Sequence, residues 1–300
     1  MKVILLGTAA GGGYPQWNCA CTRCVRAGED TSPARTHDCV AVSADGTDWY
    51  LLNAGPDIRG QVLATPELAA GPGPRESPLR GALLTDAELD HTLGLPQLRE
   101  AAGGLRVHAS AAVLHALSAG FPLRDITDAY GGWSWEPAAP EFELGGLRVR
   151  TLPVGVKRPK YAHGLEHDGP WVVAYRVEDA RTDAAFVYAP CLATWPDGFD
   201  AFVAGARYAL VDGTFYAADE MSGATTSGAA SGVSTEAQRR MGHVPIVDSM
   251  PLLRRHPDVR WGYTHLNNTN PVLCTTSAEY AEVRAAGVEL PPDHTVLEFS

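Results

Sequence analysis

Short apolar runs separated by turn residues recur along the 300-residue chain. Such runs, when bounded by Gly, Pro or Asp, are typical of buried strands. The first run, at residues 2–6, ends at Gly7 and leads into a glycine-rich loop that continues to Gly13. Further runs predict strands at 39–43, 49–52, 83–85, 147–152, 171–177, 186–189 and 208–211.

Helical spacing of apolar residues predicts helices at 95–101, 110–119 and 278–286. Because these segments lie between some of the strands, the order favours a layered α/β protein over an all-β protein. No internal repeat of about 20 to 50 residues occurs, and no change of composition marks a domain boundary. We therefore expect one domain that spans residues 1–300 and has one large core.

The segment 222–234 consists almost wholly of Ser, Gly, Thr, Ala and Val. This composition indicates flexibility, and a plain linker would have the same composition. Because the segment follows the Asp212-Gly-Thr turn, which carries a candidate ligand, we favour a flexible lid over the active site.

The formal net charge of -11 and the absence of any Lys/Arg-rich run argue against a nucleic acid or an anionic membrane as partner. The apolar stretch after Met1 is too short for a signal peptide, and no segment has the roughly 18 apolar residues of a membrane span. We expect a cytoplasmic protein whose partner is a small molecule, and a homodimer stays open.

Three of the six cysteines lie together as Cys19, Cys21 and Cys24. Disulfides are not expected in a reducing compartment. The Cys-x-Cys-x-x-Cys spacing lets three thiolates converge on one tetrahedral ion, which predicts a structural zinc site with a fourth ligand from elsewhere. The alternative is three small thiols that pack as hydrophobic side chains.

A second cluster follows the apolar run at 83–85. It contains Asp86, Glu88, Asp90 and then His91. Where a strand passes into a loop, the three carboxylates would share one side, and they would repel one another unless a cation or a raised pKa neutralised them. The alternative is the acidic first turn of a helix.

Two more possible ligands, Asp212 and His265, each follow an apolar segment, which is where open α/β sheets place functional side chains. Each is a weak signal alone, because a single histidine is more often a surface residue. The remaining histidines without an informative context are interpreted as structural: His37, His108, His115, His256 and His294.

Taken in order, these motifs resemble the metallo-β-lactamase superfamily and, within it, the pyrroloquinoline quinone biosynthesis protein B family. The resemblance spans nearly the whole chain, and its most specific stretches are 11–19, 90–95, 211–215, 240–243 and 263–271. It implies an αββα sandwich, in which two mixed β-sheets are flanked by helices and loops at one edge hold metal.

The superfamily motif His-x-His-x-Asp-His falls on residues 86–91, where Asp86 and Glu88 replace both leading histidines. Hydrolases of the superfamily use those two imidazoles to hold one of two zinc ions. The resemblance then leaves Asp90, His91, Asp212 and His265 as first candidates for an active-site metal. Two imidazoles with a carboxylate suit non-haem Fe(II), and the matched motifs bring no cysteine near.

By this resemblance the chain is an iron-dependent hydroxylase that uses dioxygen on a cross-linked Glu-Tyr amino acid. Asp86 and Glu88 would then handle protons or bind the ammonium groups of the substrate. Two other functions stay open: a dinuclear-zinc metallohydrolase of phosphodiesterase or lactonase type, and a non-enzymatic carrier of a quinone product.

The fourth ligand of the structural zinc also has alternatives. A related phosphodiesterase of carbon–phosphorus metabolism shares the cysteine triplet and has a histidine ligand three residues after its last active-site histidine. Asn268 occupies that position here. Because asparagine is a poor zinc ligand, either its carbonyl oxygen coordinates or another residue, such as His243, completes the site.

Overall fold

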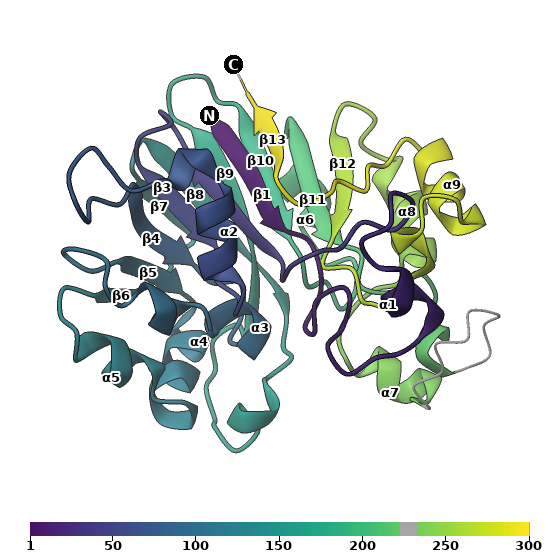
Figure 1. Ribbon diagram of the computed structural model, residues 1–300, viewed down its shortest axis with the longest axis horizontal. Helices are drawn as coiled ribbons and strands as arrows, with labels where there is room; N and C mark the ends of the chain where they lie inside the picture. The colour runs from purple at the N-terminus through teal and green to yellow at the C-terminus, as the bar shows by residue number, and fades with distance from the viewer. Residues whose placement is uncertain (223–232, 300) are drawn as a thin grey trace.

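Two β-sheets pack against each other at the centre of the molecule, which is shown as a computed structural model in Figure 1. The structure describes residues 1–222 and 233–299. Within them, the first sheet has the order β13 (Thr295–Glu298), β1 (Lys2–Gly7), β2 (Cys39–Ser43), β3 (Trp49–Leu52), β4 (Leu79–Leu83), β5 (Arg106–Ala109) and β6 (Ser134–Pro137). The second has the order β12 (Arg260–Thr264), β11 (Tyr208–Asp212), β10 (Ala185–Ala189), β9 (Val172–Asp179), β8 (Leu147–Gly155) and β7 (Glu141–Leu144).

Both sheets are mixed. In the first, β13, β1, β2 and β3 pair antiparallel, whereas β3, β4, β5 and β6 pair parallel. In the second, β10, β11 and β12 are parallel, and the remaining pairs are antiparallel. Parallel neighbours end at the same edge of a sheet, so loops that follow β10, β11 and β12 begin close together.

Alternating side chains of each strand enter two different cores. In β10, Phe186 and Tyr188 face the other sheet, whereas Val187 and Ala189 belong to the core beneath the helices. Successive side chains of a strand point to opposite faces, and both faces of this strand are covered. The strand therefore appears in the sequence as a continuous apolar run.

Helices cover the outer face of each sheet. On the first sheet lie α2 (Ile58–Ala64), α4 (Ala111–His115) and α5 (Leu123–Asp128), and on the second lie α6 (Phe199–Val203), α8 (Ile246–Leu253) and α9 (Ala278–Ala285). The short helices α1 (Thr22–Arg26), α3 (Leu89–Thr92) and α7 (Thr235–Arg239) belong to connecting loops. The expected αββα sandwich is confirmed.

Some predicted elements differ from the structure. The strand expected at 83–85 is wrong, because β4 spans Leu79–Leu83 and shares only its last residue with that range. The helix expected at 95–101 is a single 3-10 turn, Leu95–Leu98, with Pro96 near its start. The helix expected at 110–119 changes to π geometry after His115.

Most of the expected lid at 222–234 lies outside the described residues. Its ends are ordered: Ser222 closes a 3-10 turn, Glu220–Ser222, and Ser234 caps α7 by accepting a hydrogen bond from Ala237 N.

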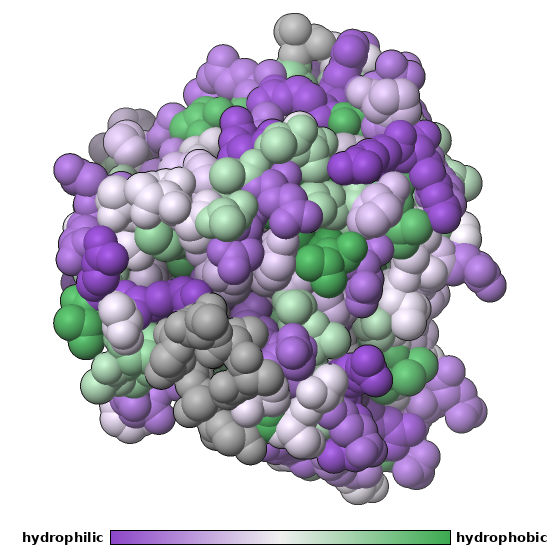
Figure 2. Space-filling view, turned by 90° about the vertical axis from the view of Figure 1, so that its right-hand side faces the viewer, coloured by the Kyte–Doolittle hydropathy of each residue, from purple (hydrophilic) through white to green (hydrophobic). Residues whose placement is uncertain are grey.

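Every helix among the described residues is too short or too polar to span a lipid bilayer. On the face shown in Figure 2, hydrophobic residues form small separate areas among hydrophilic ones.

Candidate metal centre

Four loops meet at one edge of the sandwich. The register of β11 with β12 pairs Asp212 with Thr264. His265 is the next residue after Thr264, so it begins close to Asp212. The loop after β4 is fixed to the second sheet, because Val173 N donates a hydrogen bond to Thr85 O at 2.8 Å. This connection brings the acidic stretch from the first sheet to the ligands from the second sheet.

His91 lies deep in this edge, with its side chain 1% exposed. Its Nδ1 lies 2.9 and 2.8 Å from the two carboxylate oxygens of Asp86. Its Nε2 is buried, has no hydrogen-bond partner among the described residues and lies 3.8 Å from Asp90 Oδ2. An unpaired buried polar atom costs about 1–3 kcal/mol, and an imidazole held by a carboxylate on one nitrogen is the usual arrangement of a metal ligand.

His265 faces the same space. Its Nδ1 lies 2.8 Å from Thr214 Oγ1, and its Nε2 lies 3.3 Å from Asp90 Oδ2. The ring centroids of His265 and His91 are 5.1 Å apart. Asp90 is therefore the carboxylate next to the Nε2 atoms of both imidazoles. The glycine-rich loop packs onto it, since a Cβ on Gly11 would lie 3.0 Å from Asp90 Oδ2.

The electrostatics of this group favour a cation. Burial, the largest single cause, raises the pKa of Asp86, but the charge and hydrogen bond of His91 and the hydrogen bond from Glu88 N together outweigh it and lower the pKa to about 2. Burial likewise lowers the pKa of His91, but Asp86 and Asp90 outweigh it and raise the pKa to about 10. The carboxylates thus hold a proton on His91 at neutral pH, and a divalent cation would meet the same negative potential and displace that proton.

Asp212 lies beside these residues, and its oxygens are already well supplied with donors. They accept hydrogen bonds from Leu192 N at 2.7 Å and from Thr214 N at 3.0 Å. The Thr214 hydroxyl and His243 Nδ1 add contacts of 2.7 Å each. The ligand atoms of Asp212, His243 and His265 lie within 4.8 Å of one another, so this trio could also hold an ion.

His243 was not expected in the active site, and its place beside Asp212 shows that it faces this centre. The stretch 240–243, which ends in His243, is one of those that carry the family resemblance. It lies far from the other ligands in the sequence, so no local motif connects it to them. The loop before α8 brings it in, since Val244 N donates to Leu192 O at 2.6 Å.

Cys191 is the second residue missed by sequence reasoning. Its thiol lies within 4.8 Å of the ligand atoms of His91 and His265, so the expectation that no cysteine is near is wrong. The physical reason is that β10, which precedes it, ends at the same edge as its parallel neighbour β11. Burial first, and then the charge of Asp86, raise the pKa of this thiol well above its ordinary value.

The three carboxylates of the acidic stretch do not share one side. Asp86 holds His91, Asp90 lies between the two imidazoles, and Glu88 Oε1 pairs with Lys157 Nζ at 3.2 Å. The alternative of a helix start is also correct in part, because α3 begins directly after Glu88. A small pocket beside this pair is lined by Asp86, Glu88, Gly155, Lys157, Val172, Cys191, Ala193 and Gly242.

The cysteine triplet converges as its spacing predicted. The sulfur atoms of Cys19, Cys21 and Cys24 lie within 4.8 Å of one another. Asn268 Nδ2 lies 3.4 Å from Cys24 Sγ, and exchanging the oxygen and nitrogen of this amide would direct Oδ1 to the sulfurs instead. His243 pairs with Asp212, so the structure favours Asn268 over His243 as the fourth ligand. The zinc itself stays a prediction.

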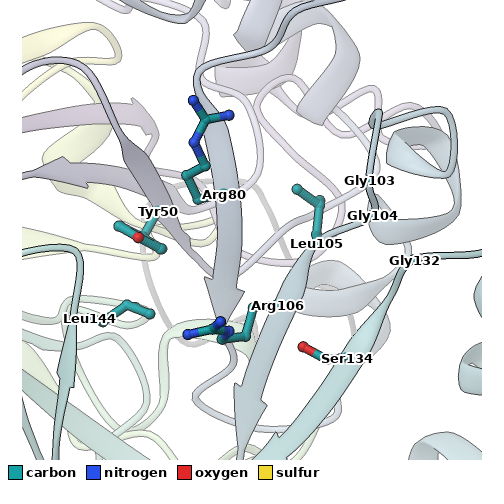
Figure 3. A pocket seen from close by; sticks show the side chains of 9 residues that line it. All are labelled: Tyr50, Arg80, Gly103, Gly104, Leu105, Arg106, Gly132, Ser134 and Leu144. Carbon is teal, nitrogen blue, oxygen red and sulfur yellow. The ribbon is translucent and has the colours of Figure 1, made fainter.

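A different cavity, of about 280 Å³, opens on the first sheet (Figure 3). Arg80 and Arg106 line it from the neighbouring strands β4 and β5. Both guanidinium groups already have carboxylate partners: Arg80 Nε lies 2.7 Å from Asp48, and Arg106 Nε lies 3.5 Å from Glu136. The cavity shares no lining residue with the metal cluster, so we place the functional site at the histidines.

The sandwich with metal ligands at one edge defines the class of protein. Residues 48–266 match the beta-lactamase superfamily domain. The chain is 37% identical over 304 residues to coenzyme PQQ synthesis protein B of Cupriavidus necator, covering 97% of each chain. It is 36% identical over 306 residues to the protein of that name from Methylococcus capsulatus, covering 98% of each.

Solved structures agree with this result. The crystal structure of Zn²⁺-bound PqqB from Methylobacterium extorquens has a TM-score of 0.86 and 33% identity, with all of both chains covered. A diphosphatase of the PhnP family has a TM-score of 0.70 at 18% identity, covering 99% of this chain and 96% of its own, which shows the fold alone. The chain belongs to the coenzyme PQQ synthesis protein B family and has a role in PQQ biosynthesis.

Proposed function

We propose that the chain is an iron- and oxygen-dependent hydroxylase that acts on a tyrosine-derived, Glu-Tyr cross-linked amino acid in PQQ biosynthesis. The observation that carries the proposal is which partners the side chains of Asp86 and Glu88 have. Asp86 is used to hold His91, and Glu88 is paired with Lys157. The two positions that would hold the first zinc of a superfamily hydrolase are therefore engaged elsewhere, which leaves a centre suited to one metal.

Asp90, His91 and His265 fit the metal, with Asp212 as the additional carboxylate. The free Nε2 of His91 and the Nε2 of His265 both face Asp90. Two imidazoles and a carboxylate with open positions suit Fe(II), which when bound supplies the activation of dioxygen. Asp86 fixes the ring of His91, and Thr214 fixes the ring of His265. The Zn²⁺-bound relative supports metal binding by this fold.

The pocket beside the centre supports an amino-acid substrate. Lys157 can bind a carboxylate of the substrate, and Glu88 can bind an ammonium group, once each releases the other. In a chain with a net charge of -11, a lysine at this position provides the positive charge that an anionic substrate needs. The substrate and dioxygen are thus the partners of the proposed reaction.

The test is oxygen consumption by protein loaded anaerobically with Fe(II), with a dihydroxyphenyl amino acid as substrate analogue and a chemical reductant that supplies two electrons for each hydroxylation. Replacing His265 with alanine should abolish substrate-dependent oxygen uptake, because the metal loses an imidazole. His256→Ala is the matched control, since His256 pairs with Asp200 and is not part of the metal cluster. Unchanged uptake by the His265→Ala variant would refute the proposal.

One observation favours a second candidate, a dinuclear-zinc metallohydrolase. Asp212, His243 and His265 could hold a second ion, and His243 would partly replace the lost imidazoles. This candidate requires two zinc ions per chain at the active-site edge and hydrolysis of a phosphodiester or lactone without oxygen. The carrier alternative requires instead that product binds without any metal-dependent turnover.

A further inference from the structure

We propose that Cys191 binds the active-site metal as a thiolate, together with His91 and His265. The proposal rests on the metal centre of the proposed function and not on its reaction. A thiolate would make the centre softer and more negative than two imidazoles and a carboxylate alone, which strengthens its affinity for zinc, cobalt and iron over magnesium or calcium.

The first support is the position of the sulfur. The ligand atoms of Cys191, His91 and His265 all lie within 4.8 Å of one another, a spacing that one ion at the centre can bridge. The three residues come from different loops, after β10, after β4 and after β12, so no local sequence constraint forces the thiol to this place.

The second support is the unpaired nitrogen of His91. Its Nδ1 is taken by Asp86, so only Nε2 is available to a ligand. This Nε2 is buried in a side chain that is 1% exposed and has no hydrogen-bond partner among residues 1–222 and 233–299. In His265, Thr214 likewise takes Nδ1, and Nε2 lies 3.3 Å from Asp90 Oδ2. Two imidazoles thus offer their Nε2 atoms beside the thiol.

The third support is that the backbone of Leu192, the residue after Cys191, is held by two hydrogen bonds. Leu192 N donates to Asp212 Oδ2 at 2.7 Å, and Leu192 O accepts from Val244 N at 2.6 Å. By contrast, Cys39, another buried cysteine, donates its thiol to Asn53 O at 3.1 Å, which is the behaviour of a packing residue. Ligation at Cys191 would break the S–H bond, release one proton to solvent and form a sulfur–metal bond.

Cobalt(II) substitution tests the proposal. The cysteine triplet is first filled with zinc, and one equivalent of Co²⁺ is then added to wild type, Cys191→Ser and Cys39→Ser. Wild type and Cys39→Ser should show near-ultraviolet absorption from sulfur-to-cobalt charge transfer, and Cys191→Ser should lose it. Any contribution from the cysteine triplet is the same in all three proteins and cancels in the difference spectra.

A second variant keeps the test independent of folding. Cys191→His retains a ligand without sulfur, so it should bind Co²⁺ with affinity close to wild type but without the charge-transfer absorption. Cys191→Ser should bind at least about tenfold more weakly. Equal charge-transfer absorption in wild type and Cys191→Ser overturns the proposal. Because these readouts do not depend on turnover, loss of the hydroxylase assignment would leave them unaffected.

Discussion

Replacing Asp86 with asparagine should weaken metal binding at His91 by about ten- to a hundredfold, or about 1.4–2.8 kcal/mol, the usual effect of removing a carboxylate that holds a ligating imidazole. Asp86 makes both oxygen contacts to His91 Nδ1 and is buried with it. An amide can still accept a hydrogen bond from Nδ1, so the ring orientation should survive. What is lost is the negative charge.

Two effects of that lost charge oppose each other. Asp86 is the strongest of the charges that raise the pKa of His91 to about 10 despite burial, so in wild type the metal must displace a tightly held proton. The variant reduces this competition. A divalent ion carries twice the charge of the proton, however, so the loss of attraction to the metal outweighs the gain.

The assay is competition with a chelator under anaerobic conditions, from about pH 6 to pH 9. Wild-type affinity should rise with pH over this range, because deprotonation of His91 accompanies binding. The Asp86→Asn variant should bind more weakly, and its affinity should level off at lower pH. Glu88→Gln is the control: its partner is a partly exposed Lys157, so we expect a change below about fivefold. Equal effects of both substitutions would show that the charge of Asp86 does not control metal binding at His91.

Three further predictions concern other parts of the chain. Cys21→Ser should lower both zinc content and the melting temperature, and a variant with full zinc and an unchanged melting temperature contradicts the structural site. Placing histidine at both Asp86 and Glu88 should strengthen binding of a second zinc, and calorimetry that still finds one zinc at the active edge would argue against the superfamily comparison. Burial raises the pKa of Glu220 from 4.5 to about 7. The protonated side chain therefore makes its full contribution to the free energy of unfolding below about pH 4.5. This contribution, about 3 kcal/mol at most, is lost as the pH rises through about 7. Glu220→Gln should remove this loss, and parallel stability curves for both proteins between pH 5 and pH 8 would show that Glu220 does not titrate in this way.

Much of the fold could be predicted, because its central strands are buried on both faces. The runs that became β1, β2, β3, β10 and β11 are continuous and apolar, and their bounds agree with the structure to within a residue. Strands at the margins were missed: β6 and β7 are short and partly exposed, so they lack that signal. The predicted strand at 83–85 was wrong because an apolar run does not show where a strand ends.

In the candidate site, residues that are close in the sequence could be predicted, whereas residues that only the fold brings together could not. The convergence of Cys19, Cys21 and Cys24 could be predicted because it depends on local spacing. Cys191 and His243 could not, since tertiary contacts bring them to the other ligands from loops far away in the sequence. The sequence also could not show that Asp86 and Asp90 lie on the two different nitrogens of one imidazole.

The most direct test of the hydroxylase is the origin of the oxygen atom in the product. Iron-loaded protein is given the cross-linked substrate and a chemical reductant under ¹⁸O₂ in ordinary water, and the product is analysed by mass spectrometry. The reductant supplies the two electrons that convert the second oxygen atom of each dioxygen to water. If the chain is the proposed hydroxylase, one labelled oxygen atom should enter the tyrosine-derived ring for each hydroxylation, and Cys39→Ser should incorporate label as wild type does. A product that carries only unlabelled oxygen from water would contradict it.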